Sequence, residues 1–232
     1  MLSPIDQDAL PSYAPGVVSN MATYTTADLR PAAGGLFDEG IFGQPNGSDG
    51  ESNDDVLVCG PRTTRFGRIT LAEPVPHPLV HGVLLLTVPV LPADLRRVAL
   101  QRGQLVLGDL NRLYLEVLRY NARIVRLRKL GIPDALDMIA LIRKELARAV
   151  AALMKNERLE DPVRDESGRV LTSLSGSLKP SVAEALGMLD ECAIHGAMLG
   201  GPLPMPVHRI VATLIAMALE VRSKNGTILR LH

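Results

Sequence analysis

The feature that most constrains this fold is a pair of apolar-periodic segments in residues 109–156, separated by the turn Leu130-Gly131-Ile132-Pro133-Asp134. Apolar residues recur every three or four positions on both sides of the turn, which is the period of an amphipathic helix. Asp109 suits an N-cap, Gly131 suits the position after a helix end, and Pro133 prevents continuation. We therefore predict two antiparallel helices of about 22 residues, each about 33 Å long. The predicted apolar faces comprise Leu110, Leu113, Val117, Tyr120, Ile124 and Leu127 in the first helix and Leu136, Ile139, Ile142, Leu146, Val150 and Leu153 in the second.

A basic stripe flanks the apolar face of the first predicted helix. Arg112, Arg119, Arg123 and Arg126, with Glu116 among them, are spaced so that they share one side. Such a stripe is either a solvated helix surface or a binding surface. Since arginine suits carboxylates and phosphates alike, either an acidic protein or a phosphate-bearing partner fits the second interpretation.

Composition narrows the class of protein. Of the 232 residues, 47% are hydrophobic but only 3% are aromatic, so the core must be aliphatic. The formal net charge is zero, so any nucleic-acid binding must come from a local patch. Two cysteines make no disulfide framework, no apolar run is long enough for a membrane span, and the first twenty residues lack the features of a signal peptide. These features favour a cytoplasmic protein.

The rest of the chain predicts an α+β fold that is mainly α. Residues 1–20 are expected to be flexible, residues 21–108 to form a small, irregular β part, and residues 44–55 to form a polar linker within it. After the hairpin at 109–156, residues 157–180 form a polar loop and residues 181–232 a C-terminal helical section. Strands are predicted at Val56–Val58, Gly67–Leu71 and Val83–Val90, and C-terminal helices at Ser181–His195 and Val207–Ser223. The last helix is so apolar that it is either core or an oligomer contact.

Four segments, in this order, together resemble the N-terminal clamp region of the β′ subunit of bacterial RNA polymerase. The resemblance spans roughly residues 20 to 180. It rests on Thr25–Pro31 with Gly34–Gly43, on Arg65–His77, on Val90–Arg97, and on Asp109–Leu153, and a following loop at Ser173–Leu178 is also similar. It implies that the hairpin corresponds to the clamp helices, the coiled coil on which the sigma factor docks.

The departures from the family's pattern are informative. The family's zinc ribbon uses four cysteines, whereas the corresponding space here holds Cys59 alone. The family's catalytic loop, with three aspartates that hold magnesium, is absent, and no Asp-x-Asp-x-Asp cluster occurs in the chain. We therefore assign no catalytic residue, no metal and no cofactor, and any polymerase activity would belong to a complex. Two other pairs, His77 with His81 and Cys192 with His195, lack the further partners that a metal site or a catalytic site needs.

The resemblance also indicates a partner-binding surface. Arg123 and Arg126 fall where the family has arginines that meet sigma, whereas Tyr120 replaces another arginine. Ile142 or a neighbour occupies the place of an acidic contact on the second helix. The candidate binding residues are Arg112, Arg119, Tyr120, Arg123, Arg126 and Ile142.

Three hypotheses follow. The first is a non-catalytic, clamp-like protein that docks a sigma factor. The second is a split or reduced β′ that joins the RNA polymerase core and contacts DNA through the complex. The third is a helical protein that self-associates through Val207–Ser223. None of them involves a membrane or a small-molecule substrate.

Overall fold

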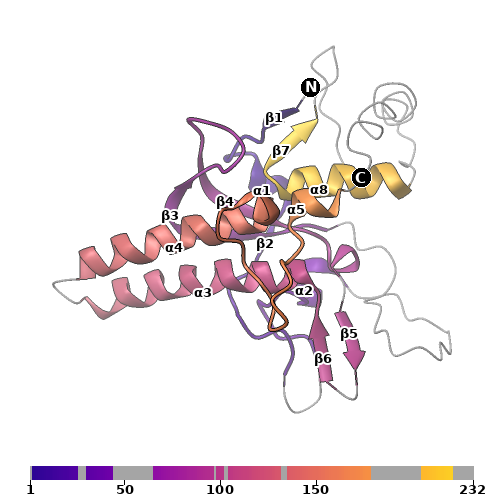
Figure 1. The fold of residues 1–232 in the computed structure, drawn as a ribbon, viewed down its shortest axis with the longest axis horizontal. Helices are drawn as coiled ribbons and strands as arrows, with labels where there is room; N and C mark the ends of the chain where they lie inside the picture. The colour runs from indigo at the N-terminus through magenta and orange to yellow at the C-terminus, as the bar shows by residue number, and fades with distance from the viewer. Residues whose placement is uncertain are drawn as a thin grey trace.

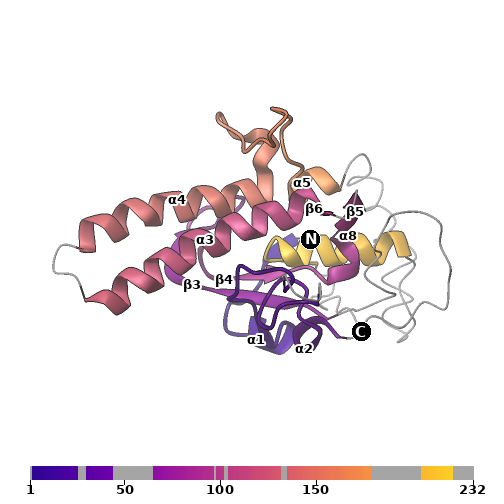
Figure 2. The ribbon, with the colours of Figure 1, turned by 90° about the horizontal axis from the view of Figure 1, so that it is seen from below.

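The computed structural model describes residues 2–25, 30–43, 65–96, 98–101, 104–131, 135–178 and 205–221. The fold is α+β, as predicted: small sheets and short helices form a body from which a long helical hairpin projects (Figure 1). Seen from below, the hairpin covers one side of the strands and the two N-terminal helices lie on the other (Figure 2). Among the described residues, no helix is both long and apolar enough to cross a bilayer.

The body contains a three-stranded sheet. Its order is β2 (Gly16–Val17), β3 (Gly67–Pro76) and β4 (Leu84–Val90), with β2 parallel and β4 antiparallel to β3. The predicted strands in Gly67–Leu71 and Val83–Val90 are thus confirmed, although β3 continues to Pro76. The predicted strand at Val56–Val58 and the linker at 44–55 lie outside the described residues.

A second ribbon was not expected from the sequence. The strands β5 (Val98–Gln101) and β6 (Gln104–Leu107) pair antiparallel and extend from the body just before the hairpin begins (Figure 1). The alternation in these strands is too short to have been recognised.

The N-terminal segment differs from the expected flexible tail. Strand β1 (Leu2–Pro4) pairs antiparallel with β7 (Leu219–Val221), and a short helix, α1 (Leu10–Tyr13), follows it. Ile5 and Leu10 are buried. The segment is held by burial of these apolar side chains and by pairing with a distant strand, and neither is visible in its local Pro- and Ser-rich composition.

The C-terminal helix also differs from the prediction. Helix α8 (Met205–Ala216) ends well before Ser223, because the chain turns at Ala218, with φ of 55°, into strand β7. Every residue from Val211 to Leu219 is buried inside this chain. The apolar residues from Val211 to Leu219 are therefore core, which contradicts self-association through this part of Val207–Ser223. The helix predicted at Ser181–His195 lies outside the described residues.

One buried arginine organises the centre of the body. Arg96, which follows the 3-10 turn η1 (Ala93–Leu95), is only 1% exposed. Its Nε donates to the Leu91 carbonyl at 2.9 Å, Nη1 donates to Oδ1 of Asn111 at 2.6 Å, and Nη2 donates to the Leu36 carbonyl at 2.5 Å. The guanidinium thus joins three distant segments of the chain.

Aromatic rings surround the same guanidinium. Its carbon lies 5.0 Å from the ring centre of Phe37, 4.9 Å from that of Phe42 in α2 (Glu39–Phe42), and 5.9 Å from that of Tyr114. Such cation–π contacts are strongest where water is excluded. The Tyr114 hydroxyl donates to the Pro89 carbonyl at 3.2 Å and accepts from the Leu91 N–H at 3.3 Å, and burial raises the pKa of Tyr114 to about 12.

Replacing this arginine should destabilise the whole body. We expect Arg96→Met to lower the free energy of unfolding by about 3–5 kcal/mol, because it leaves two buried carbonyls and the Asn111 amide without their donors. Urea denaturation followed by circular dichroism measures the change. Arg123→Met, an exposed arginine, is the matched control and should stay within about 0.5 kcal/mol of wild type. Equal effects in the two variants would contradict the central role of Arg96.

Candidate partner-binding site on the helical hairpin

The hairpin consists of α3 (Asp109–Leu130) and α4 (Ala135–Lys155), packed antiparallel as predicted. Gly131 ends α3 in the left-handed conformation, with φ of 59°, and its N–H donates to the Arg128 carbonyl. The turn residues 132–134 lie outside the described part of the chain. Most of the predicted contact face is confirmed, and its fully buried members are Leu113, Val117, Ile124, Leu146, Val150 and Leu153.

An irregularity in β3 fixes the hairpin to the sheet. Between the pairs Thr70↔Thr87 and Val75↔Leu85 the register shifts, so the chain from Leu71 to Pro74 bulges away from β4. A bulge leaves backbone groups without a strand partner. Asn121 of α3 replaces that partner: its Oδ1 accepts from the Ala72 N–H at 2.7 Å and its Nδ2 donates to the Thr70 carbonyl at 2.9 Å.

Two basic side chains strengthen this anchorage. Arg128 donates to the Ala72 carbonyl at 2.8 Å and forms an ion pair with Glu73. At the other end of the hairpin, Lys155 donates to the Pro78 carbonyl at 2.8 Å. Side chains that bind backbone therefore hold α3 on β3 and α4 on the loop that follows β3.

The opposite face of α3 is left open. At 100° per residue, Arg119 and Arg123 each lie about 160° around the helix from Asn121. Both side chains and that of Arg126 are exposed. Arg119 pairs with Glu116 at 2.5 Å and its guanidinium carbon lies 5.0 Å from the Tyr120 ring centre. Within the described residues, Arg123 and Arg126 have no hydrogen bond or ion pair.

The other predicted binding residues have structural contacts. Arg112 is partly buried, and its Nε donates to the Leu107 carbonyl of β6 at 3.2 Å. Tyr120 and Ile142 are partly buried and pack against the apolar core. The structure therefore brings Arg119, Arg123 and Arg126 together on one exposed surface, which we call the basic face, and places the remaining three beside or beneath it.

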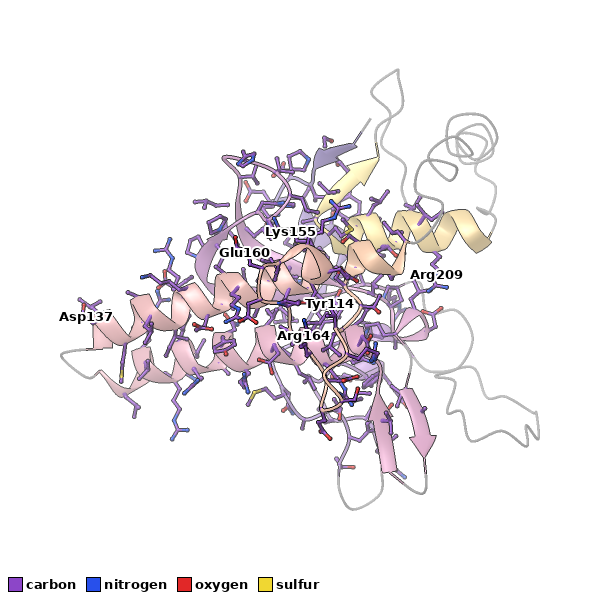
Figure 3. All side chains as sticks on the ribbon, viewed as in Figure 1. Tyr114, Asp137, Lys155, Glu160, Arg164 and Arg209 are labelled. Carbon is purple, nitrogen blue, oxygen red and sulfur yellow. The ribbon has the colours of Figure 1, made fainter. Side chains whose placement is uncertain are left out.

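The far end of the hairpin carries exposed apolar side chains that sequence reasoning missed. Leu136 was expected on the contact face but is 77% exposed, because the body of the protein does not reach this end. Asp137 marks this end in Figure 3. We call the exposed group the apolar tip; it consists of Val125, Leu130, Leu136, Met138 and Leu141. Several exposed apolar side chains at one end of a hairpin are a candidate interaction site. In the sequence, the apolar pattern of the two helices simply continues up to the turn. That pattern does not reveal where the body stops covering the hairpin.

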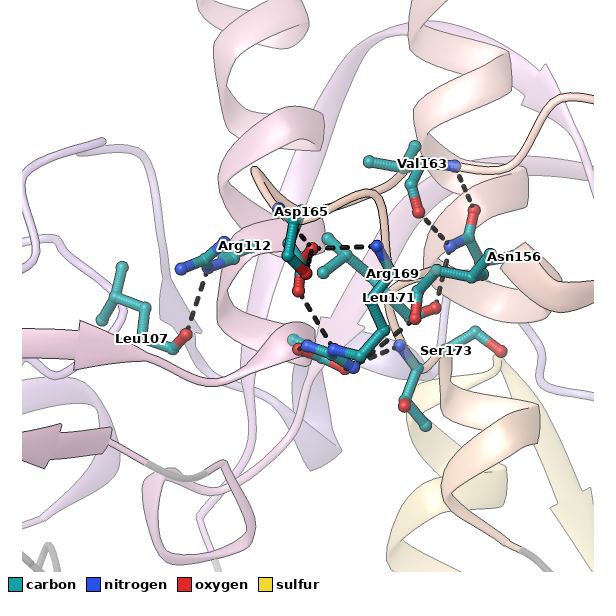
Figure 4. A network of polar contacts seen from close by, with 12 residues as sticks. Leu107, Arg112, Asn156, Val163, Asp165, Arg169, Leu171 and Ser173 are labelled. Carbon is teal, nitrogen blue, oxygen red and sulfur yellow. Dashed lines mark hydrogen bonds and ion pairs between the residues drawn. The ribbon is translucent and has the colours of Figure 1, made fainter.

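The polar loop after the hairpin forms an ordered network at its base (Figure 4). Arg169 forms two bonds of 2.8 Å with the Asp109 carboxylate, which also accepts from the Thr172 N–H at 2.9 Å. Asp165 pairs with Arg169 at 3.0 Å. The predicted N-cap role of Asp109 is thus wrong: Gly108 is the N-cap and no side chain caps the helix. The Asp109 carboxylate instead binds Arg169 and the Thr172 N–H of the loop.

A buried asparagine holds the other side of the loop. Asn156, in the 3-10 turn η2 (Asn156–Arg158), donates from Nδ2 to the carbonyls of Val163 and Leu171, each at 2.8 Å. Its Oδ1 accepts from the Val163 N–H at 2.8 Å. The short helix α5 (Leu174–Ser177) follows, with Ser173 as its N-cap. The side-chain amide of Asn156 therefore holds the loop in the conformation that leads into α5.

Comparison with known proteins adds to this geometry. No protein-family model matches the chain. Over 98 residues, or 42% of the chain, it is 38% identical to the DNA-directed RNA polymerase subunit β′ of Treponema pallidum and 41% identical to that of Clostridioides difficile. Over 99 residues it is 41% identical to the β′ subunit of Thermobifida fusca. This part of the chain is similar to a region of β′. The chain spans only 7% or 8% of the length of these subunits.

The anchorage of the hairpin can be tested at Asn121. Asn121→Leu should lower the free energy of unfolding by about 1–3 kcal/mol, because the Ala72 N–H and the Thr70 carbonyl lose their partners at the bulge. Arg126→Leu, on the same helix but with no described contact, is the control and should change the stability by less than about 0.5 kcal/mol. Thermal and urea denaturation provide the measurement, and an unchanged Asn121→Leu variant would contradict the anchorage.

The loop network predicts a response to acid. The side-chain bonds from Arg169, aided by the Thr172 N–H, lower the pKa of Asp109 from 3.8 to about 2. A lowered carboxylate pKa stabilises the folded state above pH 3.8, and this contribution disappears as the pH falls toward 2. Asp109→Asn should therefore be about 1–2 kcal/mol less stable at pH 7 and show a smaller loss between pH 4 and pH 2. Asp137→Asn, an exposed carboxylate at the hairpin tip, should retain the wild-type acid profile.

Proposed function

We propose that this protein acts in DNA-templated transcription as a β′-like protein that docks a sigma factor through the α3–α4 hairpin, without catalysis of its own. The observation that carries the proposal is the basic face, which is held open because Asn121 and Arg128 fix the other side of α3 to the sheet. The similarity to β′ subunits over 42% of the chain supports the transcriptional setting.

The charge of the hairpin supports a negatively charged partner. The two helices together contain ten basic and four acidic residues, although the whole chain has a net charge of zero. Arg123 and Arg126 are exposed and have no partner among the described residues, so they are available for carboxylates on a docked helix. Arginine forms paired hydrogen bonds with carboxylates, which favours a defined orientation of the partner.

The apolar tip supports a protein partner. Leu130, which is 58% exposed, lies on the same side of α3 as the basic face, between that face and the turn. Protein interfaces commonly combine an apolar centre with a charged rim. A partner helix with apolar and acidic residues fits both features, whereas free phosphate would use only the arginines.

The second candidate is a reduced β′ component of an RNA polymerase complex. It is favoured by the comparisons, because the matched proteins are polymerase subunits and this chain spans only 7% or 8% of their length. In that case the hairpin would belong to a larger assembly, and DNA would be contacted through the complex.

A binding experiment tests the sigma proposal. Purified sigma factors of the source organism are passed over the immobilised full-length protein, and the dissociation constant is measured by biolayer interferometry. Changing Arg119, Arg123 and Arg126 together to Glu should weaken binding at least about tenfold, because charges on the contact surface reverse sign. No measurable binding by the wild-type protein would overturn the proposal.

A matched triple variant controls for net charge. Changing Arg65, Arg158 and Arg209 to Glu alters the charge equally, but these exposed residues lie off the hairpin, and Arg209 lies near the far end of α8 (Figure 3). This variant should bind as wild type. Equal loss in both triple variants would contradict a specific basic face, and copurification with polymerase core in the absence of sigma would favour the second candidate.

A further inference from the structure

A buried histidine connects the end of β3 to the C-terminal segment. The loop from His77 to Val83 joins β3 to β4 and is closed by the His77 N–H, which donates to the Val83 carbonyl at 2.8 Å. The imidazole is 5% exposed. Its Nδ1 lies 3.1 Å from the Leu79 N–H nitrogen and 3.2 Å from that of Val80, while Nε2 lies 3.1 Å from the Met217 carbonyl oxygen.

These contacts fix the protonation state of the ring. Backbone N–H groups only donate, so Nδ1 must accept and therefore carries no proton. The Met217 carbonyl only accepts, so Nε2 must carry the proton and donate. The ring is thus the neutral tautomer, and a second proton on Nδ1 would point at two N–H donors. Burial lowers the pKa of His77 and outweighs the hydrogen bonds to the Met217 and Ala218 backbone, which act in the opposite direction.

The charged neighbours of this loop do not favour an imidazolium. The Lys155 ammonium of α4 donates to the carbonyl of Pro78, the residue next to His77, and so places a positive charge nearby. Glu73 of β3 is already paired with Arg128, and Glu220 of β7 accepts from the Ser3 hydroxyl. The other titratable residues on the elements packed here are the exposed His81, Asp6 and Asp8, and Arg209, which lies more than two turns before Met217.

The Met217 carbonyl stands at a junction. It follows α8 and precedes Ala218, whose carbonyl accepts from the Ile5 N–H at 2.9 Å. From there the chain enters β7, which pairs with β1 (Figure 1). The histidine bond is therefore placed where the C-terminal helix, the C-terminal strand and the N-terminal strand meet the body.

We propose that His77 is an acid-released latch. Uptake of a proton from solvent at Nδ1 places an N–H against the N–H groups of Leu79 and Val80, and the ring leaves its site. The Nε2–H bond to the Met217 carbonyl is lost with it, which opens the 77–83 loop and loosens α8, β7 and β1 from the sheet. The neutral ring holds these elements at and above neutral pH, and the hold weakens as the pH falls below 6.5, the ordinary value for histidine. This inference concerns the fold itself and is independent of the hairpin's partner.

Nuclear magnetic resonance of the full chain tests the latch. The His77 ring is titrated directly, and amide exchange of Ile5 and of β7 is measured between pH 7.5 and pH 5 and corrected for the intrinsic exchange rate. In the wild type, corrected protection should fall by up to about tenfold per pH unit below pH 6.5, because opening is linked to one proton. A His77 that titrates at its ordinary pKa, with protection independent of pH, would overturn the proposal.

Two variants separate the latch from a general acid effect. His77→Gln keeps one acceptor and one donor but cannot be protonated in this range, so its corrected protection should be nearly constant. His81→Gln removes an exposed histidine from the same loop and should retain the wild-type pH dependence. If His77→Gln fails to fold, the wild-type ring titration and the His81→Gln profile still decide the proposal. Loss of the pH dependence in His81→Gln would also contradict it.

Discussion

A buried guanidinium is the interaction on which the rest of the structure depends. Burying an arginine is costly unless its donors are satisfied, so the segments around Arg96 must all be in place before it can be accommodated. Leu36, Leu91 and Asn111 supply acceptors, and rings from α2, α3 and the segment before α2 surround the charge. Because of this requirement, three segments that are far apart in the sequence form one unit: residues 34–43, residues 90–96 and the start of the hairpin.

The hairpin is likewise fixed by side chains that form hydrogen bonds with backbone groups of distant segments. The bulge in β3 begins after Thr70, and Asn121 of α3 binds the Thr70 carbonyl and the Ala72 N–H at this point. At the start of α3, Asp109 is held by Arg169 rather than by its own helix. One face of α3 is thereby committed to the sheet along its length, and the opposite face remains free for a partner. The contacts of Asn121 at the strand irregularity thus help to fix which side of α3 faces the sheet.

The sequence was most informative where a local period determines the structure. The hairpin and the strands β3 and β4 could be predicted because the spacing of apolar residues within each segment distinguishes a helix from a strand. Gly131 and Pro133 marked the turn. The ordered N-terminal segment, the end of α8 and the role of Asp109 depend instead on contacts between residues far apart in the chain. The basic face could be predicted from its spacing. The apolar tip could not, because exposure of Leu136 depends on how far the body extends.

Tyr120 has a specific consequence for the basic face. Arg119 lies over the Tyr120 ring and pairs with Glu116, so its guanidinium is already engaged within α3. A partner that used Arg119 would have to displace both contacts, which reduces the net gain from that residue. Arg123 and Arg126 carry no such cost, because neither has a hydrogen bond or an ion pair among the described residues. In the proposed docking, Arg123 and Arg126 would therefore contribute more to recognition than Arg119.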